Sequence, residues 1–162
     1  MQNKDPKIKD LEQTIMKYKR TVYGIALTQL NSKHEADDVF QEVFLLYFVK
    51  KPDFDSENAK RAWLIRTTLY KCRQYNNSKW NTHTDKTNEP DENRLVDFES
   101  ESDAELYAAV KQLPQKLREA VYLHCFLGLS LNECAQLLGV GVSAVSMRLK
   151  KAERILKERS EG

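Results

Sequence analysis

The last third of the chain carries residues whose types and spacing suit contact with the bases of nucleic acids. Val145 and Leu149 lie four positions apart and predict the apolar side of a helix. The opposite side would present hydroxyl, thioether and ammonium groups to base edges in a DNA groove. The residues expected to face outward are Ser143, Ser146, Met147 and Lys150.

The same helix is basic enough to bind phosphates. Its six cations are offset only by Glu153 and Glu158, which leaves a net charge of +4. Duplex DNA attracts such a surface without regard to base sequence. The cations are Arg148, Lys150, Lys151, Arg154, Lys157 and Arg159.

Features just upstream predict that this helix is the second of a helix-turn-helix. Ala135 supplies a small residue where two helices would cross, and Gly139 tolerates the positive φ of a tight turn. Ser130 and Glu133 form a capping box that opens the first helix. We therefore predict docking in the major groove of double-stranded DNA, the simpler alternative being a helical hairpin whose basic residues are only solvated.

A second group of polar residues lies near the N-terminus. Ser32 and Glu35 form a capping box, and the helix that follows carries an apolar side that includes Val39 and Val43. Its other edge is polar and acidic, which is typical either of a solvated face or of a docking surface for a protein. That edge consists of Asp37, Asp38, Gln41 and Glu42.

The sequence shows no recognisable arrangement for catalysis or for metal binding. The three His are scattered, and no Gly-rich phosphate loop or framed acid–base pair occurs, so we expect neither an enzyme nor a cofactor. Cys72, Cys125 and Cys134 form no CxxC pair and fall in apolar helical stretches, which predicts buried, reduced thiols. No apolar run approaches the roughly 18 residues of a membrane span. We therefore expect a cytoplasmic protein without membrane contact.

Helical spacing recurs in nearly every segment, so we predict an all-α fold of two small helical domains. The other expected elements are a first helix from Asp5-Pro6 with an apolar stripe from Ile8 to Leu30, a third helix from about Glu57 to about Asn76, a capping box at Ser102 and Glu105, a helix from Pro114 to Gly128, and a last helix from about Val142 to Glu158.

The net charge of +2 conceals an uneven distribution along the chain. Residues 1–84 carry 15 basic and 10 acidic residues (+5), residues 85–105 carry 2 and 9 (−7), and residues 106–162 carry 9 and 5 (+4). Basic modules on an acidic tether are typical of nucleic-acid-binding proteins, and a single domain with one acidic loop is the alternative. We place the domains at residues 1–80 and 103–162, with a flexible acidic linker at 81–102.

Two segments of the chain resemble bacterial RNA polymerase sigma factors. LPQKLREAVYLHCFLGLSLNECAQLLGVGVSAVSMRLKKAERILK is similar to their region 4, and EADDVFQEVFLLYF is similar to their region 2. The compact two-module layout resembles the extracytoplasmic function (ECF) group of the sigma-70 family. The resemblance covers about residues 8–80 and 104–158, and the region 2 motif makes it specific, because many response regulators share the helix-turn-helix alone.

The resemblance implies a sigma factor, a non-catalytic polymerase subunit that directs core RNA polymerase to promoters for transcription initiation. The acidic edge Asp37, Asp38, Gln41 and Glu42 would dock on the clamp helices of the largest polymerase subunit. An anti-sigma factor would be a further partner. Region 4 would bind the minus-thirty-five element as duplex through Ser143, Ser146, Met147, Arg148, Lys150 and Lys151.

The stretch RAWLIRTTLYKCRQYNNSKW is similar to the helix with which the family melts promoters and recognises the minus-ten strand. Aromatic rings there would support unstacked bases, and cations would follow the backbone, with Trp63 either in the core or a stacking platform. The chain has Tyr70 where the family has an Asn beside a flipped base, and Gln74 where it has Asp. The expected contacts are Lys60, Arg61, Trp63, Arg66, Tyr70 and Arg73.

One other class of protein remains open at this point. A stand-alone helix-turn-helix regulator would use the N-terminal helices for dimerisation or for a partner, and a degenerate sigma-like protein would lack promoter melting. Such a regulator would bind a specific duplex without polymerase, often as a dimer on a two-fold site.

Overall fold

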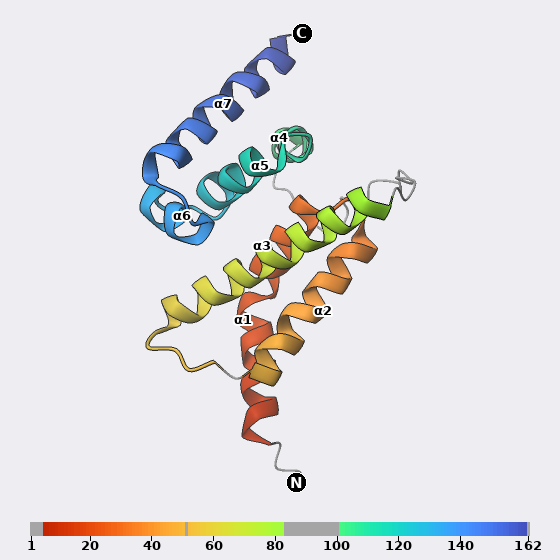
Figure 1. Cartoon of the computed structure of the whole chain (residues 1–162), viewed down its shortest axis with the longest axis vertical. Coiled ribbons are helices and arrows are strands. Elements are labelled where there is room, and N and C mark those ends of the chain that lie inside the picture. Colours follow the sequence, from red (N-terminus) through yellow and green to blue (C-terminus); the bar gives the residue numbers. More distant parts are fainter. Residues whose placement is uncertain (1–4, 51, 83–100, 162) are drawn as a thin grey trace. The chain divides into compact units, whose positions relative to one another are not determined.

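The computed structural model describes residues 5–50, 52–82 and 101–161, which form two compact units on either side of residues 83–100 (Figure 1). All regular structure in these ranges is helical, so the predicted all-α class is confirmed. Within the same ranges no helix is both long enough and apolar enough to cross a membrane. Most of the predicted linker, residues 81–102, lies outside the described residues.

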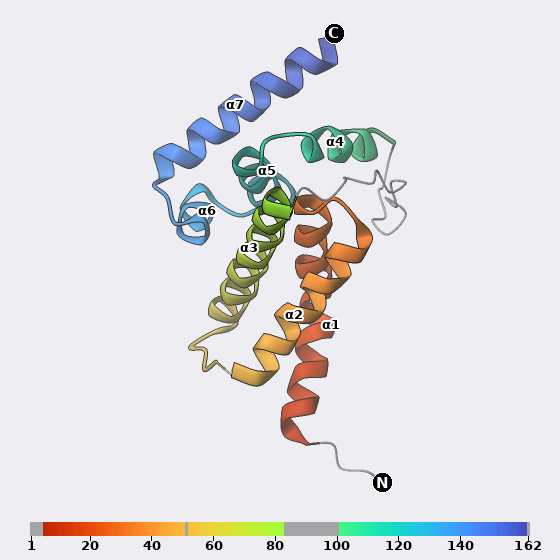
Figure 2. The same ribbon diagram turned by 45° about the vertical axis from the view of Figure 1, so that its right-hand side comes forward.

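The N-terminal unit is a bundle of three helices, α1 (Pro6–Gln29), α2 (Lys33–Lys50) and α3 (Glu57–Thr82), which lie side by side in both ribbon views (Figures 1 and 2). The predicted caps are confirmed. The Asp5 side chain accepts a hydrogen bond from the Lys7 backbone at 2.9 Å, and Ser32 Oγ accepts one from the Glu35 backbone at 3.2 Å. The largest fully buried side chains of the bundle are Val22, Ile25, Leu30, Val39, Val43, Leu64, Ile65 and Leu69.

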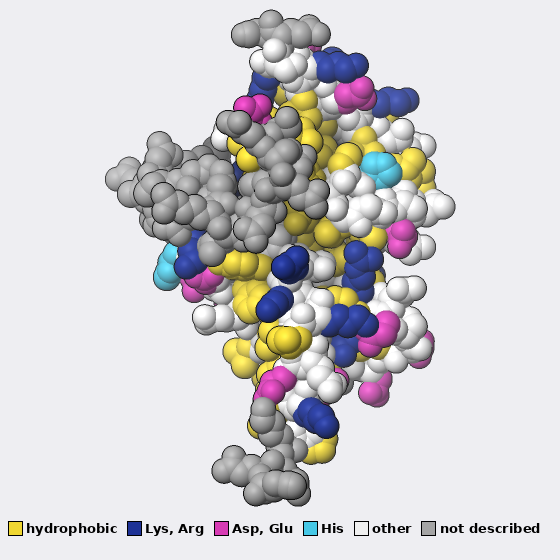
Figure 3. All heavy atoms as spheres, turned by 180° about the vertical axis from the view of Figure 1, so that it is seen from behind, with side chains coloured by type: hydrophobic (Ala, Val, Ile, Leu, Met, Phe, Trp, Pro, Cys, Tyr) yellow, Lys and Arg dark blue, Asp and Glu magenta, His cyan; other side chains and the backbone are white. Residues whose placement is uncertain are grey.

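The apolar stripe predicted along α1 is buried only in its C-terminal part. The first turns of α1 extend past the ends of α2 and α3, so the side chain of Ile8 remains 42% exposed (Figure 2). The Met16 side chain, which lies off the stripe, is 70% exposed. From behind, Lys and Arg side chains stand along this part of the molecule with hydrophobic side chains between them (Figure 3).

Helix α3 continues to Thr82, past the point near Asn76 where the loss of apolar spacing predicted its end. Contacts with the other two helices hold α3 at the predicted end. The Asn76 amide donates a hydrogen bond to the Gln29 backbone oxygen of α1 at 3.1 Å, and the Tyr75 hydroxyl donates one to Asp38 of α2 at 2.8 Å. Tertiary hydrogen bonds thus support a polar stretch that its own spacing would not identify as helical.

The C-terminal unit consists of α4 (Glu101–Lys111), α5 (Gln115–Val121), the π-helical turn η2 (Tyr122–Phe126), α6 (Leu131–Leu138) and α7 (Val142–Glu161). A core cluster from α4, the following turn, α5 and α7 holds it together, formed by Val110, Leu113, Leu117, Val121 and Ala152. The capping box predicted at Ser102 is wrong. Helix α4 already includes this residue, and an N-cap residue has non-helical backbone angles.

The π-helical turn η2 is a feature that the sequence did not predict. The Leu127 backbone N–H donates to the Tyr122 oxygen at 3.0 Å, an i to i−5 bond that adds one residue to the turn. Within this turn, Leu123 is fully buried and Cys125 is exposed. The expectation of buried thiols is confirmed for Cys72 and Cys134 and is wrong for Cys125.

Gly139 and Gly141 form a matched pair for testing the turn between α6 and α7. Gly139 has φ +70°, whereas Gly141 lies outside the left-handed region, and a Cβ at either position would meet no atom within 4 Å. We expect Gly139→Ala to destabilise the turn by about 1 kcal/mol, because only the left-handed backbone opposes the methyl group. Gly141→Ala should be neutral or stabilising by about 0.5 kcal/mol. Hydrogen exchange of α6 and α7 amides in the full chain measures both, and equal losses of protection would contradict the assignment.

Candidate functional site

Helices α6 and α7 form the predicted helix-turn-helix, joined by a short turn (Figure 2). Both halves of the capping box are present at the start of α6. The Glu133 backbone donates to Ser130 Oγ at 3.1 Å, and the Ser130 backbone donates to Glu133 Oε1 at 2.9 Å. Gly139 ends α6 in the left-handed conformation, and Ala135 is buried. These local signals determine the tight turn after which the chain changes direction and α7 begins.

The packing of α7 determines which side of it is available to a partner. Val145 and Ala152 are fully buried, and Leu149 packs against the core cluster of the unit. The opposite side is open to solvent, and the Met147 side chain is 71% exposed there. Of the six residues expected to contact DNA, the exposed ones are Ser143, Met147, Lys150 and Lys151, and the half-buried ones are Ser146 and Arg148.

The exposed side of α7 changes in character along the helix. Its first six residues carry no charge, whereas Lys150, Lys151 and Arg154 follow in the next turns and are exposed. Further along, the Lys157 ammonium lies 3.2 Å from a Glu153 carboxylate oxygen, so this cation is partly neutralised. The most positive part of α7 therefore lies in its middle, where a phosphate backbone would be attracted.

On α2, two of the four predicted docking residues are bound by tyrosines of the neighbouring helices. The Tyr23 hydroxyl of α1 donates a short hydrogen bond to Asp37, and the Tyr75 hydroxyl of α3 donates to Asp38 Oδ2 at 2.8 Å. His34 Nε2 also lies 3.7 Å from Asp38 Oδ2. The two carboxylates are thus held at the surface of the bundle in fixed positions.

The other two docking residues, Gln41 and Glu42, are exposed. The same side of α2 continues with Leu45 and Val49, whose side chains are 62% and 67% exposed. Residues at spacings of three and four share one side of a helix, so these four side chains form one strip. Leu45 and Val49 could not be predicted as exposed, because both belong to an almost continuous apolar run in which exposed and buried positions look alike.

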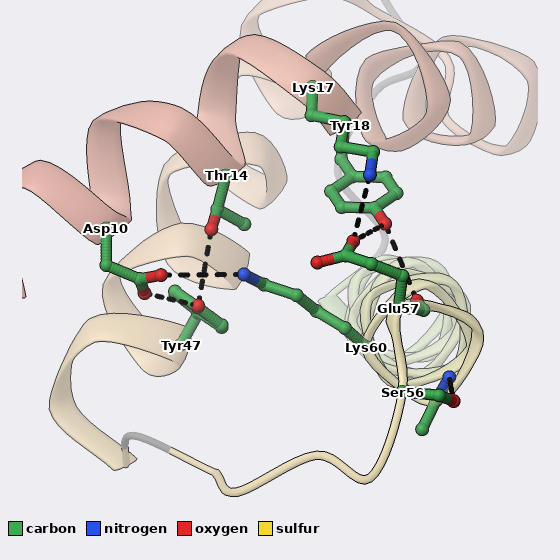
Figure 4. Close-up of polar contacts among 9 residues, drawn as sticks. Asp10, Thr14, Lys17, Tyr18, Tyr47, Ser56, Glu57 and Lys60 are labelled. Atoms are coloured by element: carbon green, nitrogen blue, oxygen red, sulfur yellow. Dashed lines mark hydrogen bonds and ion pairs between the residues drawn. The ribbon is translucent and has the colours of Figure 1, made fainter.

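Two of the residues predicted to contact the minus-ten strand face the interior of the bundle. The Lys60 ammonium lies 3.6 Å from Asp10 of α1 and over the Tyr47 ring, 5.2 Å from its centroid (Figure 4). The Trp63 ring meets the rings of Tyr47 and Phe54 edge-on, with centroids 6.1 and 6.2 Å apart. The structure therefore places Lys60 and Trp63 among contacts that join α3 to α1 and α2.

A second polar cluster in Figure 4 holds the start of α3 against α1. The Tyr18 hydroxyl donates a hydrogen bond to the Glu57 carboxylate at 2.5 Å, and the Lys17 ammonium lies 3.1 Å from the same oxygen. These hydrogen bonds, first that of Tyr18 and then that of Lys17, lower the pKa of the Glu57 carboxyl below its usual value. Beside this cluster, the hydrogen bonds from Thr14 to Tyr47 and from Tyr47 to Asp10 join α1 to α2.

Two of the four remaining predicted contacts of α3 lie toward solvent. Arg66 is exposed and Tyr70 is 57% exposed, with their positions one turn apart. The Gln74 amide donates a hydrogen bond to the Tyr70 hydroxyl at 3.1 Å, which orients the ring without covering it. Arg61 and Arg73 are half-buried. The part of α3 available for nucleic acid is therefore centred on Arg66 and Tyr70.

The cysteines and histidines that the structure describes form no site of their own. In residues 5–50, 52–82 and 101–161, no group of three or more His, Cys, Asp or Glu side chains is placed to hold a metal ion. Burial raises the pKa of the Cys134 thiol to about 11, which keeps it protonated and unreactive near neutral pH. His124 Nδ1 lies 2.7 Å from the Leu129 backbone oxygen, within the unit.

Two tyrosines are expected to make the N-terminal unit less stable as the pH rises above about 10. Burial, followed by the hydrogen bond to Glu57, raises the pKa of Tyr18 to about 12. Burial, followed by the hydrogen bond to Asp38, raises the pKa of Tyr75 to about 12. Unfolding returns each hydroxyl to its ordinary pKa of about 10, so the unfolded chain releases protons first. The stabilisation is complete below pH 10 and is lost as pH rises to about 12.

We expect this loss to be on the order of 2 kcal/mol per tyrosine. Tyr75→Phe should remove about half of the decline between pH 10 and 12, and it should also lower stability near neutral pH by about 1 kcal/mol through the lost hydrogen bond. Urea unfolding followed by tryptophan fluorescence across this range measures the effect. A decline of equal size in the variant would contradict the role given to Tyr75.

Comparison with known proteins gives two domain matches and relatives that span most of the chain. A family model described as Sigma-70 region 2 matches residues 14–82, and one described as Sigma-70, region 4 matches residues 103–156. The chain is 28% identical to RNA polymerase sigma factor SigZ of Bacillus subtilis, over 83% of this chain and 77% of that protein. It is 26% identical to the RNA polymerase sigma-H factor of Pseudomonas aeruginosa, over 88% and 81%.

Solved structures show the same fold. CnrH, in complex with the cytosolic domain of CnrY, is 25% identical, with a TM-score of 0.70 over 94% of this chain and 88% of that one. The sigma factor RpoE of Bartonella quintana, in complex with the anti-sigma factor NepR, is 19% identical, with a TM-score of 0.71 over 93% and 96%.

Proposed function

The chain belongs to the ECF group of the sigma-70 family, and from this premise we propose that it is a sigma factor that binds core RNA polymerase through α2 and promoter DNA through α3 and α7. The observation that carries the proposal is the presence of regions 2 and 4 in one chain, in that order. A stand-alone helix-turn-helix regulator would account for the second region but not for the first. The proposed role is non-catalytic, and it places the protein with the polymerase in the cytoplasm.

Core polymerase is proposed to dock on the side of α2 that carries Asp37, Asp38, Gln41 and Glu42, continued by Leu45 and Val49. Gln41 and Glu42 are exposed and supply polar contacts, while the two apolar side chains supply area that a partner can bury. Interfaces gain most of their affinity from a few such central, desolvated contacts within a polar surround. A mixed strip of this kind fits a helical partner surface.

Tyr23 and Tyr75 support this docking by holding Asp37 and Asp38 in place. A carboxylate has about four lone-pair sites, so Asp38 keeps acceptor capacity after it binds one tyrosine hydroxyl. Fixed side chains lose little rotational freedom when the partner binds, which favours affinity. Because Tyr75 belongs to α3, its hydrogen bond to Asp38 joins α2, the proposed docking helix, to α3, the proposed minus-ten helix.

Helix α7 is proposed to enter the major groove of the minus-thirty-five element. Its uncharged first turns face outward beside the basic residues Lys150, Lys151 and Arg154. In a helix-turn-helix, the N-terminal part of the second helix meets base edges, and nearby cations meet the phosphate backbone. Both kinds of contact are available on the exposed side of α7.

Helix α3 is proposed to contact the melted minus-ten strand through Arg66 and Tyr70, with Arg61 and Arg73 at its margins. Tyr70→Ala should lower the rate of promoter opening by roughly tenfold, because stacking of one base on an aromatic ring contributes about 1–3 kcal/mol. Binding to closed duplex should be unchanged. Fluorescence of 2-aminopurine in the minus-ten strand of a holoenzyme complex measures opening. Tyr70→Phe keeps the ring and is the control, and an equal defect in both variants would contradict stacking.

We also propose a regulatory partner of the anti-sigma class. In its solved structure the similar protein CnrH is bound to the cytosolic domain of CnrY. The α2 strip is the surface where such a partner would compete with polymerase, since it is exposed and partly apolar.

The function is tested by combining the purified chain with bacterial core RNA polymerase. We expect the two to co-elute in gel filtration, and the assembled enzyme to transcribe from a subset of genomic promoter fragments on which core polymerase alone is inactive. Binding of a specific duplex by the chain without any binding of polymerase would contradict the proposal and identify a stand-alone regulator.

A further inference from the structure

The exposed side of α7 offers no side chain that can form a paired hydrogen bond with a base in its first six residues. These residues are Val142, Ser143, Ala144, Val145, Ser146 and Met147. The usual specific contacts to guanine and adenine come from Arg, Lys, Asn or Gln, which bind two atoms of one base. None of the four stands in this segment, so recognition of a base by these six residues must use another kind of group.

Two exposed hydrophobic side chains occupy that position instead. Met147 is 71% exposed and Val142 is 40% exposed, whereas Val145 between them is fully buried and holds the helix to its unit. A single exposed hydrophobic side chain is common on protein surfaces and has no meaning by itself. Here, however, Lys150, Lys151 and Arg154 follow on the exposed surface of the same helix. Their charge complements phosphate and would hold the uncharged turn against the groove.

The chemistry of the major groove selects the group that Met147 can meet. Among the base edges of that groove, the 5-methyl of thymine is the apolar group, and the others are hydrogen-bond donors or acceptors. A methionine side chain is unbranched and flexible, so it can follow a methyl group at the edge of a base pair. The hydroxyls of Ser143 and Ser146 can each accept or donate a hydrogen bond, so they can lie beside either a donor or an acceptor on a base edge.

We propose that Met147 determines specificity by packing against the 5-methyl group of a thymine in the duplex bound by α7. The inference rests on the proposed minus-thirty-five role of α7 and adds the base it recognises. The recognised element thus contains a thymine whose methyl group, and not its pairing edge, is sensed.

The test replaces thymine by deoxyuridine, which removes the methyl group and leaves base pairing intact. Duplexes are first selected from a random library with the 162-residue chain, both alone and assembled with core polymerase. Each thymine of a selected duplex is then replaced in turn. At one position we expect wild type to bind the uracil duplex about fourfold more weakly, the factor expected for one buried methyl group. Met147→Ala should bind the two duplexes equally.

Met16→Ala is the matched control, because Met16 has nearly the same exposure, 70%, but lies on α1. It should keep the wild-type preference for thymine at that position. The proposal is overturned if no thymine is sensitive to loss of its methyl group, or if Met147→Ala keeps the discrimination. Failure to select any duplex would overturn the proposed role of α7 itself, which distinguishes the two cases.

Discussion

The double substitution Gln41→Ala/Glu42→Arg is expected to weaken binding to core RNA polymerase by about 30-fold or more, the factor for a loss of about 2 kcal/mol at an interface centre. Truncation removes one polar contact, and charge reversal places a cation where the proposed partner meets a carboxylate. Both side chains are exposed, so their loss should leave the bundle folded. Titration of labelled core polymerase at fixed ionic strength measures the affinity.

Glu105→Arg is the control for charge reversal, since Glu105 is an exposed carboxylate of α4 in the other unit. It should bind polymerase as wild type does. Asp38→Ala is a less suitable test, because it also removes the hydrogen bond from Tyr75 and so changes the packing of α3. Wild-type affinity of the Gln41/Glu42 variant, with unchanged circular dichroism, would exclude this side of α2 as the docking surface.

Removal of two cations from α7 is the second substitution with a large expected effect. Lys150→Ala/Lys151→Ala should lower affinity for a selected duplex by about 10-fold to 100-fold near 0.1 M salt, because each lysine is proposed to neutralise one phosphate. Each phosphate contact contributes about 0.9 to the slope of log affinity against log salt concentration, because it releases counterions from the DNA. Loss of both contacts should therefore lower the magnitude of this slope by about two. Fluorescence anisotropy across a range of salt concentrations yields both quantities.

Lys7→Ala/Lys9→Ala removes the same charge from the exposed start of α1 and is the matched control. This variant should change neither the affinity nor the salt slope for a minus-thirty-five duplex. If both double variants lower the slope equally, the effect arises from total charge, and α7 has no special place in binding. A loss of affinity without a change in slope would show that the two lysines act on the structure of α7 and not on phosphate.

Local sequence signals predicted most of the helices because each depends on a few neighbouring residues. The capping box at Ser130 and Glu133, the left-handed Gly139 and the buried Val145 of the helix-turn-helix are all confirmed. Helix ends without such signals were predicted less well, as in α3, which continues to Thr82 beyond the Tyr75 and Asn76 that hydrogen-bond to α2 and α1. The roles of the candidate residues in polymerase and DNA binding stay predictions.

The orientation of α3 was the least predictable feature of the candidate site. Apolar residues are spread around this helix, so the sequence defined no buried side and treated Lys60 and Arg66 alike. The structure separates them: the Lys60 ammonium faces Asp10 and Tyr47, while Arg66 faces solvent. Packing against two other helices makes this distinction, and spacing within one helix does not contain it.

The sequence by itself determined the all-α class and the helix-turn-helix, because helical period and capping act between residues a few positions apart. The order of the two regions and the sigma-70 family followed from the resemblance of two segments to known proteins. Only the tertiary structure decided which polar groups remain available. Tyr75 binds Asp38 from 37 positions away, and Cys125, which lies in the π-helical turn, is exposed. Such contacts form when separate helices meet, and their geometry depends on the rotation of each helix about its own axis.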